Sequence, residues 1–349
     1  MIELIRRFDR KRFDVHVACF HKEGAWLPKV ESHAPVTAFP IRGFARPATL
    51  ARAAGFARWC RARRIAVVQT CDLYANSFAL PAAALAGTPV RIGSRRELNP
   101  DKSSAHISLQ RQAYRFAHAV VANSHAASAM LQREGLPASR VEVIPNGIDA
   151  HRFAPRASYG PINMVLTVAN LRTEKAHEVL LQAAAALLRA HPHLQFQIAG
   201  DGPRLAELRQ LASTLGITGR VVFLGHREEV PALLAHADAF VLPSRSEAFP
   251  NGVIEAMAAG LPVVASAVGG LLDLVEPGRT GLLVPADDAQ SLAEAIDGLV
   301  RAPARAAALG SAARDEVVRR YSFDRMVRSF EDLYLSQLEM PRRVSSRAA

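Results

Sequence analysis

The chain has 349 residues, half of them hydrophobic, so we expect two globular domains rather than one. No apolar run approaches the roughly 18 residues of a membrane span, and a charged start with Glu3 and Arg6 argues against a signal peptide. The three cysteines form no CxxC pair and are expected to be buried thiols in a reducing compartment. These features predict a cytoplasmic protein.

The net charge of +11 is unevenly distributed along the chain. Residues 1–150 hold 22 Lys/Arg and 11 Asp/Glu, whereas residues 151–349 hold 21 of each. The excess predicts an anionic partner for the first half. Anionic lipid headgroups fit this charge, and no nucleic-acid partner is predicted because helix-turn-helix, finger and aromatic-rich basic patterns are lacking. A generally Arg-rich proteome is the alternative that requires no partner.

Short β-rich runs alternate with Ala/Leu/Arg-rich helical patterns along the whole chain. Strands are predicted in the first half at 14–20, 66–70, 89–93, 119–123 and 141–144, with helices such as 49–64 and 108–117 between them. Strands are predicted in the second half at 162–169, 194–199, 221–224, 239–242 and 262–266. This alternation predicts α/β domains with parallel sheets that helices cover on both faces.

A turn signal separates the two halves. Asn146-Gly147 follows Pro145, and a proline cannot sit in a central strand. We therefore expect a first domain at 1–152, a second at 153–320, a terminal helix at 321–339 and a disordered polar tail at 340–349. The terminal helix has one apolar face at helical spacing, formed by Phe323, Met326, Val327, Phe330, Leu333 and Tyr334.

The most informative segment runs from Pro243 to Ser266. A buried strand ends before it, a polar loop follows, and a helix is expected from Gly252 to Gly260. Ligands of parallel sheets bind beyond the carboxyl ends of the strands, where loop N–H groups and a helix start hold phosphate. Glu255 in the first helical turn would accept bonds from two ribose hydroxyls, and Glu247 would face a sugar. The alternative is a solvated loop acid and an ordinary helix-start charge.

Two Glu residues with seven residues between them, in this strand–loop–helix setting, resemble the signature of retaining glycosyltransferases with the GT-B fold, and family 4 matches best. The resemblance extends over almost the whole chain. The similar segments are 120–124, 143–149, 168–183, 198–203, 221–225, 269–275 and 280–285. The resemblance implies two Rossmann-like doubly wound domains that face a cleft, with the C-terminal helix packing back on the first domain.

The resemblance also implies an activity. The donor would be a UDP-, GDP- or other nucleotide-diphosphate sugar, and the acceptor a lipid-linked molecule or a glycan of the cell envelope or exopolysaccharide. Transfer would retain the anomeric configuration and need neither cofactor nor metal, since no Asp-x-Asp, HExxH or His/Cys cluster is present. The protein would be cytoplasmic and peripheral at the inner face of the membrane.

Roles for individual residues follow from the resemblance. Lys175 would bind the diphosphate, Glu247 would contact the sugar, and Arg172 would complete a cationic clamp because Asn170 stands where the family often has Arg. The donor-binding residues would be Glu255, Asn251, Gly252, Val253, Asn170, Gly200, Gly202, Gly225, Ser244 and Phe249.

The sequence departs from the family pattern in the first half. Relatives carry an opening strand and a Gly-rich loop before the helix that here starts at Met1, so we expect both to be missing. The cleft His of many relatives is replaced within 93–97, where Ser94 and Arg95 are expected on the acceptor side and Arg95 would bind either phosphate or the acceptor. A truncated non-catalytic subunit or pseudoenzyme is therefore the rival hypothesis. The two-Glu loop argues against a nucleotide-sugar epimerase.

Overall fold

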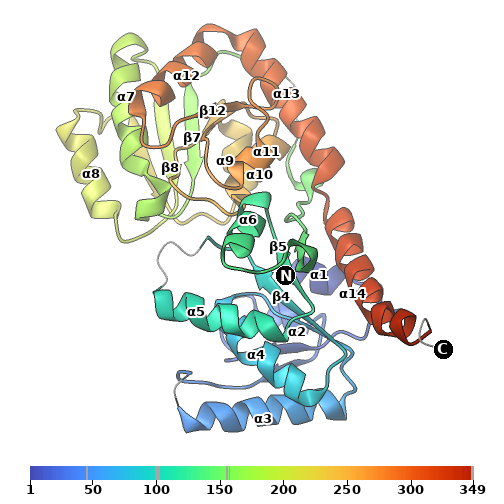
Figure 1. Ribbon diagram of the computed structural model, residues 1–349. Helices are drawn as coiled ribbons and strands as arrows, with labels where there is room; N and C mark the ends of the chain where they lie inside the picture. The colour runs from blue at the N-terminus through green and yellow to red at the C-terminus, as the bar shows by residue number, and fades with distance from the viewer. Residues whose placement is uncertain (45, 99–102, 155, 157, 347–349) are drawn as a thin grey trace. The chain divides into compact units, whose positions relative to one another are not determined.

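The computed structural model describes residues 1–346 except 45, 99–102, 155 and 157, and side chains to residue 340. It divides into two compact units (Figure 1). Unit 1 comprises Met1–Asn123, Ala127–Pro145 and Phe323–Ala349, and unit 2 comprises Ser124–Ala126 and Asn146–Ser322. The chain leaves unit 1 at Pro145, upstream of the predicted boundary at residue 152.

Unit 2 contains a six-stranded parallel sheet. Its strands are β7 (Met164–Val168), β8 (Gln195–Ala199), β9 (Val221–Gly225), β10 (Ala239–Leu242), β11 (Val263–Ser266) and β12 (Leu282–Val284). Their order is β12-β11-β10-β7-β8-β9, with every pair parallel. This is the Rossmann order 3-2-1-4-5-6, in which the direction of strand addition reverses between β7 and β10.

Helices cover both faces of this sheet. They are α7 (His177–Ala190), α8 (Leu205–Thr214), α9 (Val230–His236), α10 (Asn251–Ala258), α11 (Leu271–Leu274), α12 (Ala289–Arg301) and α13 (Pro303–Arg320), with the 3₁₀ turns η3 (Ala150–Arg152) and η4 (Thr173–Lys175). Successive residues of β10 pack into the apolar clusters on opposite faces of the sheet, because side chains along a strand point alternately to its two faces. Val241 packs with α7, α8 and α12, whereas Phe240 packs with α9, α10 and α13.

Unit 1 contains two separate parallel sheets. One pairs β1 (Val17–Cys19) with β2 (Val36–Ala38), and the other has the order β3 (Val67–Gln69), β4 (Val90–Arg95), β5 (Ala119–Ala122), β6 (Val141–Val143). The sequence analysis did not predict β2, which is only three residues long and partly buried. The helices are α1 (Ile2–Arg7), α2 (Leu27–Glu31), α3 (Pro47–Ala62), α4 (Leu73–Ala86), α5 (Ser104–Ala113) and α6 (His125–Arg133), with 3₁₀ turns η1 (Tyr114–Phe116) and η2 (Ala138–Arg140).

The terminal helix α14 (Phe323–Ser346) belongs to unit 1, as predicted. Its buried face, which includes Phe330 and Tyr334, packs with Leu4 of α1 and Ile92 of β4, and Figure 1 shows α14 beside α1. The helix continues to Ser346, where the sequence analysis expected a disordered tail from residue 340. Residues 347–349 lie outside the described part of the chain.

In the part of the chain that the structure describes, every helix is too short or too polar to cross a bilayer.

Candidate active site

A cavity of about 380 Å³ opens in unit 2 at the carboxyl ends of β7 and β10. This is the switch point of the sheet, where ligands of doubly wound folds bind. Eight of the residues predicted for the site line the cavity: Asn170, Lys175, Gly200, Glu247, Phe249, Asn251, Gly252 and Glu255.

Two glycines allow the chain to approach the end of β7 closely. A Cβ on Gly200 would lie 1.9 Å from the carbonyl oxygen of Ala169, and one on Gly252 would lie 2.8 Å from that of Val168. Gly200 also has a φ of +151°, a conformation that other residues rarely adopt. The start of α10 is therefore held against the end of β7.

Two of the three residues with predicted catalytic roles, Lys175 and Glu247, meet in the cavity. Lys175 Nζ donates to Glu247 Oε1 at 2.6 Å, and Ser244 Oγ donates to the same oxygen at 2.7 Å. The Glu247 side chain is only 6 % exposed. The Gly270 N–H fixes the loop by donating to the Glu247 carbonyl oxygen at 2.8 Å. A nearly buried carboxylate is thus oriented and neutralised by a lysine.

Glu255 is the fifth of the eight residues of α10, beyond the first turn in which the sequence analysis expected it, and it lines the same cavity. Burial raises its pKa to about 6, against the opposing influence of Arg152. Asn251 and Gly252 begin the helix beside it. The first N–H groups of a helix lack intrahelical partners and carry the positive end of its dipole, so this end favours an anion.

Five of the residues predicted to be catalytic or to bind the donor are not lining residues of the cavity. Arg172 is exposed and precedes η4, Val253 is buried in the apolar cluster under α10, and Gly202 packs against the backbone of Leu171. The Ser244 hydroxyl donates a hydrogen bond to Glu247, and Gly225 forms an isolated β-bridge with Gly200.

His226 and Arg227 line the cavity although the sequence analysis did not name them. They directly follow Gly225 at the carboxyl end of β9. Ligands of doubly wound folds bind beyond the carboxyl ends of the strands, and that rule was the signal that could have found them.

The prediction that Ser94 and Arg95 face an acceptor is corrected by the structure of unit 1. Arg95 is 1 % exposed, and its guanidinium binds Glu134 at 2.9 Å and Gln110 at 3.0 Å. Ser94 is 3 % exposed and donates to the Thr70 carbonyl at 2.6 Å. Both lie on the central strand β4, and their polar groups form hydrogen bonds inside the protein and do not face a ligand.

No group of three metal-binding side chains gathers anywhere among the residues that the structure describes.

The strand order of unit 2 and the position of its cavity define a nucleotide-binding protein of the doubly wound α/β class. Residues 1–152 match the family model described as Glycosyltransferase Family 4, and residues 151–316 match Glycosyl transferases group 1. The chain therefore belongs to the family 4, group 1 glycosyltransferases.

Similarity to a solved structure confirms the predicted GT-B fold. HepE of Anabaena, crystallised in complex with UDP, superposes with a TM-score of 0.85 at 25 % sequence identity. The match covers 96 % of this chain and 94 % of HepE.

Two curated relatives are similar over part of the sequence. An exopolysaccharide phosphotransferase of Streptomyces coelicolor is 36 % identical over 61 % of this chain and 23 % of its own length. A GDP-mannose-dependent phosphatidylinositol monomannoside mannosyltransferase of Mycolicibacterium smegmatis is 35 % identical over 51 % of this chain and 52 % of its own length. The chain thus spans about half or less of the length of these relatives.

Proposed function

We propose that this protein transfers a sugar from a nucleotide-diphosphate sugar to a glycan or lipid-linked acceptor. The observation that carries the proposal is the cavity that collects Lys175, Glu247, Glu255 and the start of α10. A cation and a helix start suit a diphosphate, and a carboxylate suits a ribose diol. The UDP bound to HepE and the names of the mannosyltransferase and exopolysaccharide relatives support the same class of chemistry.

Each residue has a defined task in this proposal. Lys175 and the α10 amides bind the diphosphate, Glu255 accepts from the ribose hydroxyls, and Glu247 binds hydroxyls of the sugar. Negative charge grows on the diphosphate as its bond to the sugar C1 breaks, so a fixed cation stabilises the transition state more than the ground state. A Lys175 that is already oriented by Glu247 needs no further ordering for this task.

The finer features of the reaction are also part of the proposal. The bond from C1 to the diphosphate oxygen breaks, the acceptor oxygen bonds to C1 on the same face, and the acceptor proton passes to the leaving diphosphate. Lys175 supplies positive charge to the leaving group, which makes a metal unnecessary. The anomeric configuration of the product, read by NMR against that of the donor, tests retention.

Unit 1 would meet an anionic membrane that presents the acceptor at its inner face. Its sequence holds the excess of positive charge, and α3 exposes Arg52, Arg58 and Arg61. Large apolar side chains are exposed on the same unit, with Leu50 at 75 % and Trp26 at 65 %. Basic and apolar side chains together favour peripheral attachment.

A panel of nucleotide-sugars tests the proposal. We expect one nucleotide class to bind by calorimetry and its sugar donor to be hydrolysed slowly, then transferred when a lipid-linked acceptor is added. Binding without hydrolysis or transfer would favour the non-catalytic rival. Absence of binding to every nucleotide would contradict the proposal.

A further inference from the structure

Arg245 joins the two loops that carry Lys175 and Glu247. It lies two residues before Glu247, on the loop that follows β10. Its backbone N–H donates to the Glu174 carbonyl at 2.8 Å, and its Nη1 donates to the Thr173 carbonyl at 2.7 Å. One residue therefore fixes both carbonyl groups that immediately precede Lys175.

The same guanidinium binds two carboxylates from other segments. Its Nη2 lies 2.6 Å from Glu178 Oε1, in the first turn of α7, and its Nε lies 2.7 Å from Asp287 Oδ1, in the loop after β12. Three nitrogens of a planar group thus have three differently placed acceptors, a geometry that a lysine ammonium cannot reproduce.

The acceptors of Arg245 are themselves held in place. Glu178 also binds Arg204 at 2.6 Å. Burial alone would raise the pKa of Glu178, but a backbone hydrogen bond together with the bonds from Arg245 and Arg204 lowers it. Asp287 has a φ of +60°, a left-handed conformation that Asp adopts more readily than most residues with a side chain.

The distance between Lys175 and Glu247 depends on these contacts. Lys175 ends η4, a turn of only three residues, and so short a segment has little rigidity of its own. Neighbouring strands β7 and β10 bring the two loops side by side. The hydrogen bonds of Arg245 fix the position of η4 relative to the loop that carries Glu247.

We infer that Arg245 is a positioning residue for the reaction: it holds η4 so that Lys175 reaches Glu247 and the departing diphosphate. This inference rests on the proposed function. Arg245 is not a lining residue of the cavity, so its effect passes through Lys175 and not through direct contact with the donor.

A double-mutant cycle separates this role from general destabilisation. We expect Arg245→Ala to lower kcat about tenfold and to change KM less than about threefold, since transition-state charge is most sensitive to the place of the cation. In a Lys175→Ala background the same change should alter kcat less than about twofold, because the two residues act as one unit. Multiplicative losses in the double variant would overturn the inference.

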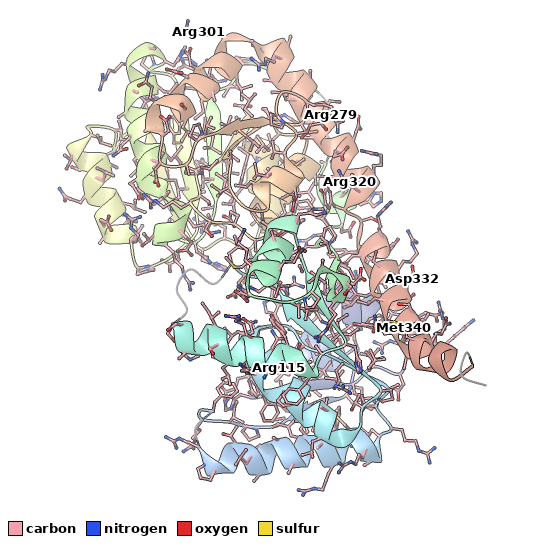
Figure 2. The ribbon with its side chains drawn as sticks, viewed as in Figure 1. Arg115, Arg279, Arg301, Arg320, Asp332 and Met340 are labelled. Carbon is pink, nitrogen blue, oxygen red and sulfur yellow. The ribbon has the colours of Figure 1, made fainter. Side chains whose placement is uncertain are left out.

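Conservative and control variants sharpen the test. Arg245→Lys should restore less than about a third of the lost kcat, since a point charge cannot bind all three acceptors; full restoration would contradict the inference. Arg279→Ala is the matched control, because Arg279 likewise binds two carboxylates, Glu276 at 2.6 Å and Glu316 at 3.0 Å. Figure 2 shows Arg279 next to α13, and its loss should leave kcat within about twofold.

Hydrogen exchange supplies a readout that needs no turnover. Amides of residues 173–176 should exchange at least about tenfold faster in Arg245→Ala than in wild type, whereas Arg279→Ala should leave them unchanged. If wild type transfers no sugar but these amides respond, the proposed function fails and the positioning contact stands. If wild type is active and these amides do not respond, Arg245 does not position η4.

Discussion

Replacing Glu255 with Gln should stabilise the empty protein and weaken its binding of nucleotide. Burial raises the pKa of Glu255 from an ordinary 4.5 to about 6, and one pKa unit corresponds to about 1.4 kcal/mol. The ionised side chain therefore costs the folded state about 2 kcal/mol. The folded state holds the proton more tightly, so this cost is absent below pH 4.5 and complete above pH 6.

The stability effect is measurable by thermal unfolding of the nucleotide-free protein. A glutamine carries no charge, so the variant should melt a few degrees higher at pH 7.5, at about 2–4 °C per kcal/mol for a domain of this size. The difference should shrink towards zero as the pH approaches 4.5. Glu294→Gln, an exposed change on α12, is the control and should leave the melting temperature unchanged at both pH values.

The binding effect has the opposite sign. A charged hydrogen bond contributes about 1.5–3 kcal/mol, so the loss of the ribose-binding carboxylate should raise Kd about 10- to 100-fold in calorimetry at pH 7.5. Wild-type affinity should also fall as the pH drops through 6, where Glu255 takes up a proton. An unchanged Kd in the folded Glu255→Gln variant would exclude Glu255 from the nucleotide site. A lower melting temperature of this variant at pH 7.5 would contradict the free-energy cost assigned to burying the ionised Glu255.

Three further outcomes are expected. In steady-state kinetics, Lys175→Ala should lower kcat by more than it raises KM, because the negative charge on the diphosphate grows in the transition state, and equal turnover in wild type and Lys175→Ala would exclude the lysine from the site. Arg172→Ala should lower kcat less than Lys175→Ala does, because Arg172 is not a lining residue of the cavity. Transfer should survive EDTA, and abolition by the chelator with rescue by magnesium or manganese would disprove metal independence. The protein should sediment with anionic but not neutral liposomes at low salt and be released at high salt, since each basic residue near the membrane surface contributes about 1 kcal/mol to binding. Negligible pelleting with both vesicle types at low salt would contradict the membrane proposal.

The sequence by itself predicted most of the elements and their order, although the short strands β2 and β12 were not predicted. Strand β10 was predicted at its observed bounds, and the helix expected from Gly252 to Gly260 is α10, Asn251–Ala258. These predictions succeed because hydrophobic periodicity and Pro/Gly punctuation are local properties of the chain. The motif around Glu247 and Glu255 likewise depends on residues that are close in sequence, and its helical and loop portions could be predicted together.

Only the tertiary structure decided which residues meet. Lys175 and Glu247 are 72 positions apart, and they touch because β7 and β10 are neighbours at the switch point, a consequence of strand order that no local pattern contains. The same holds for Arg95, which follows polar Ser94 in the sequence and is nevertheless buried against Glu134, directly after α6. Charge and polarity indicate what a side chain is able to bind, but packing between distant segments determines whether it faces a ligand or the interior.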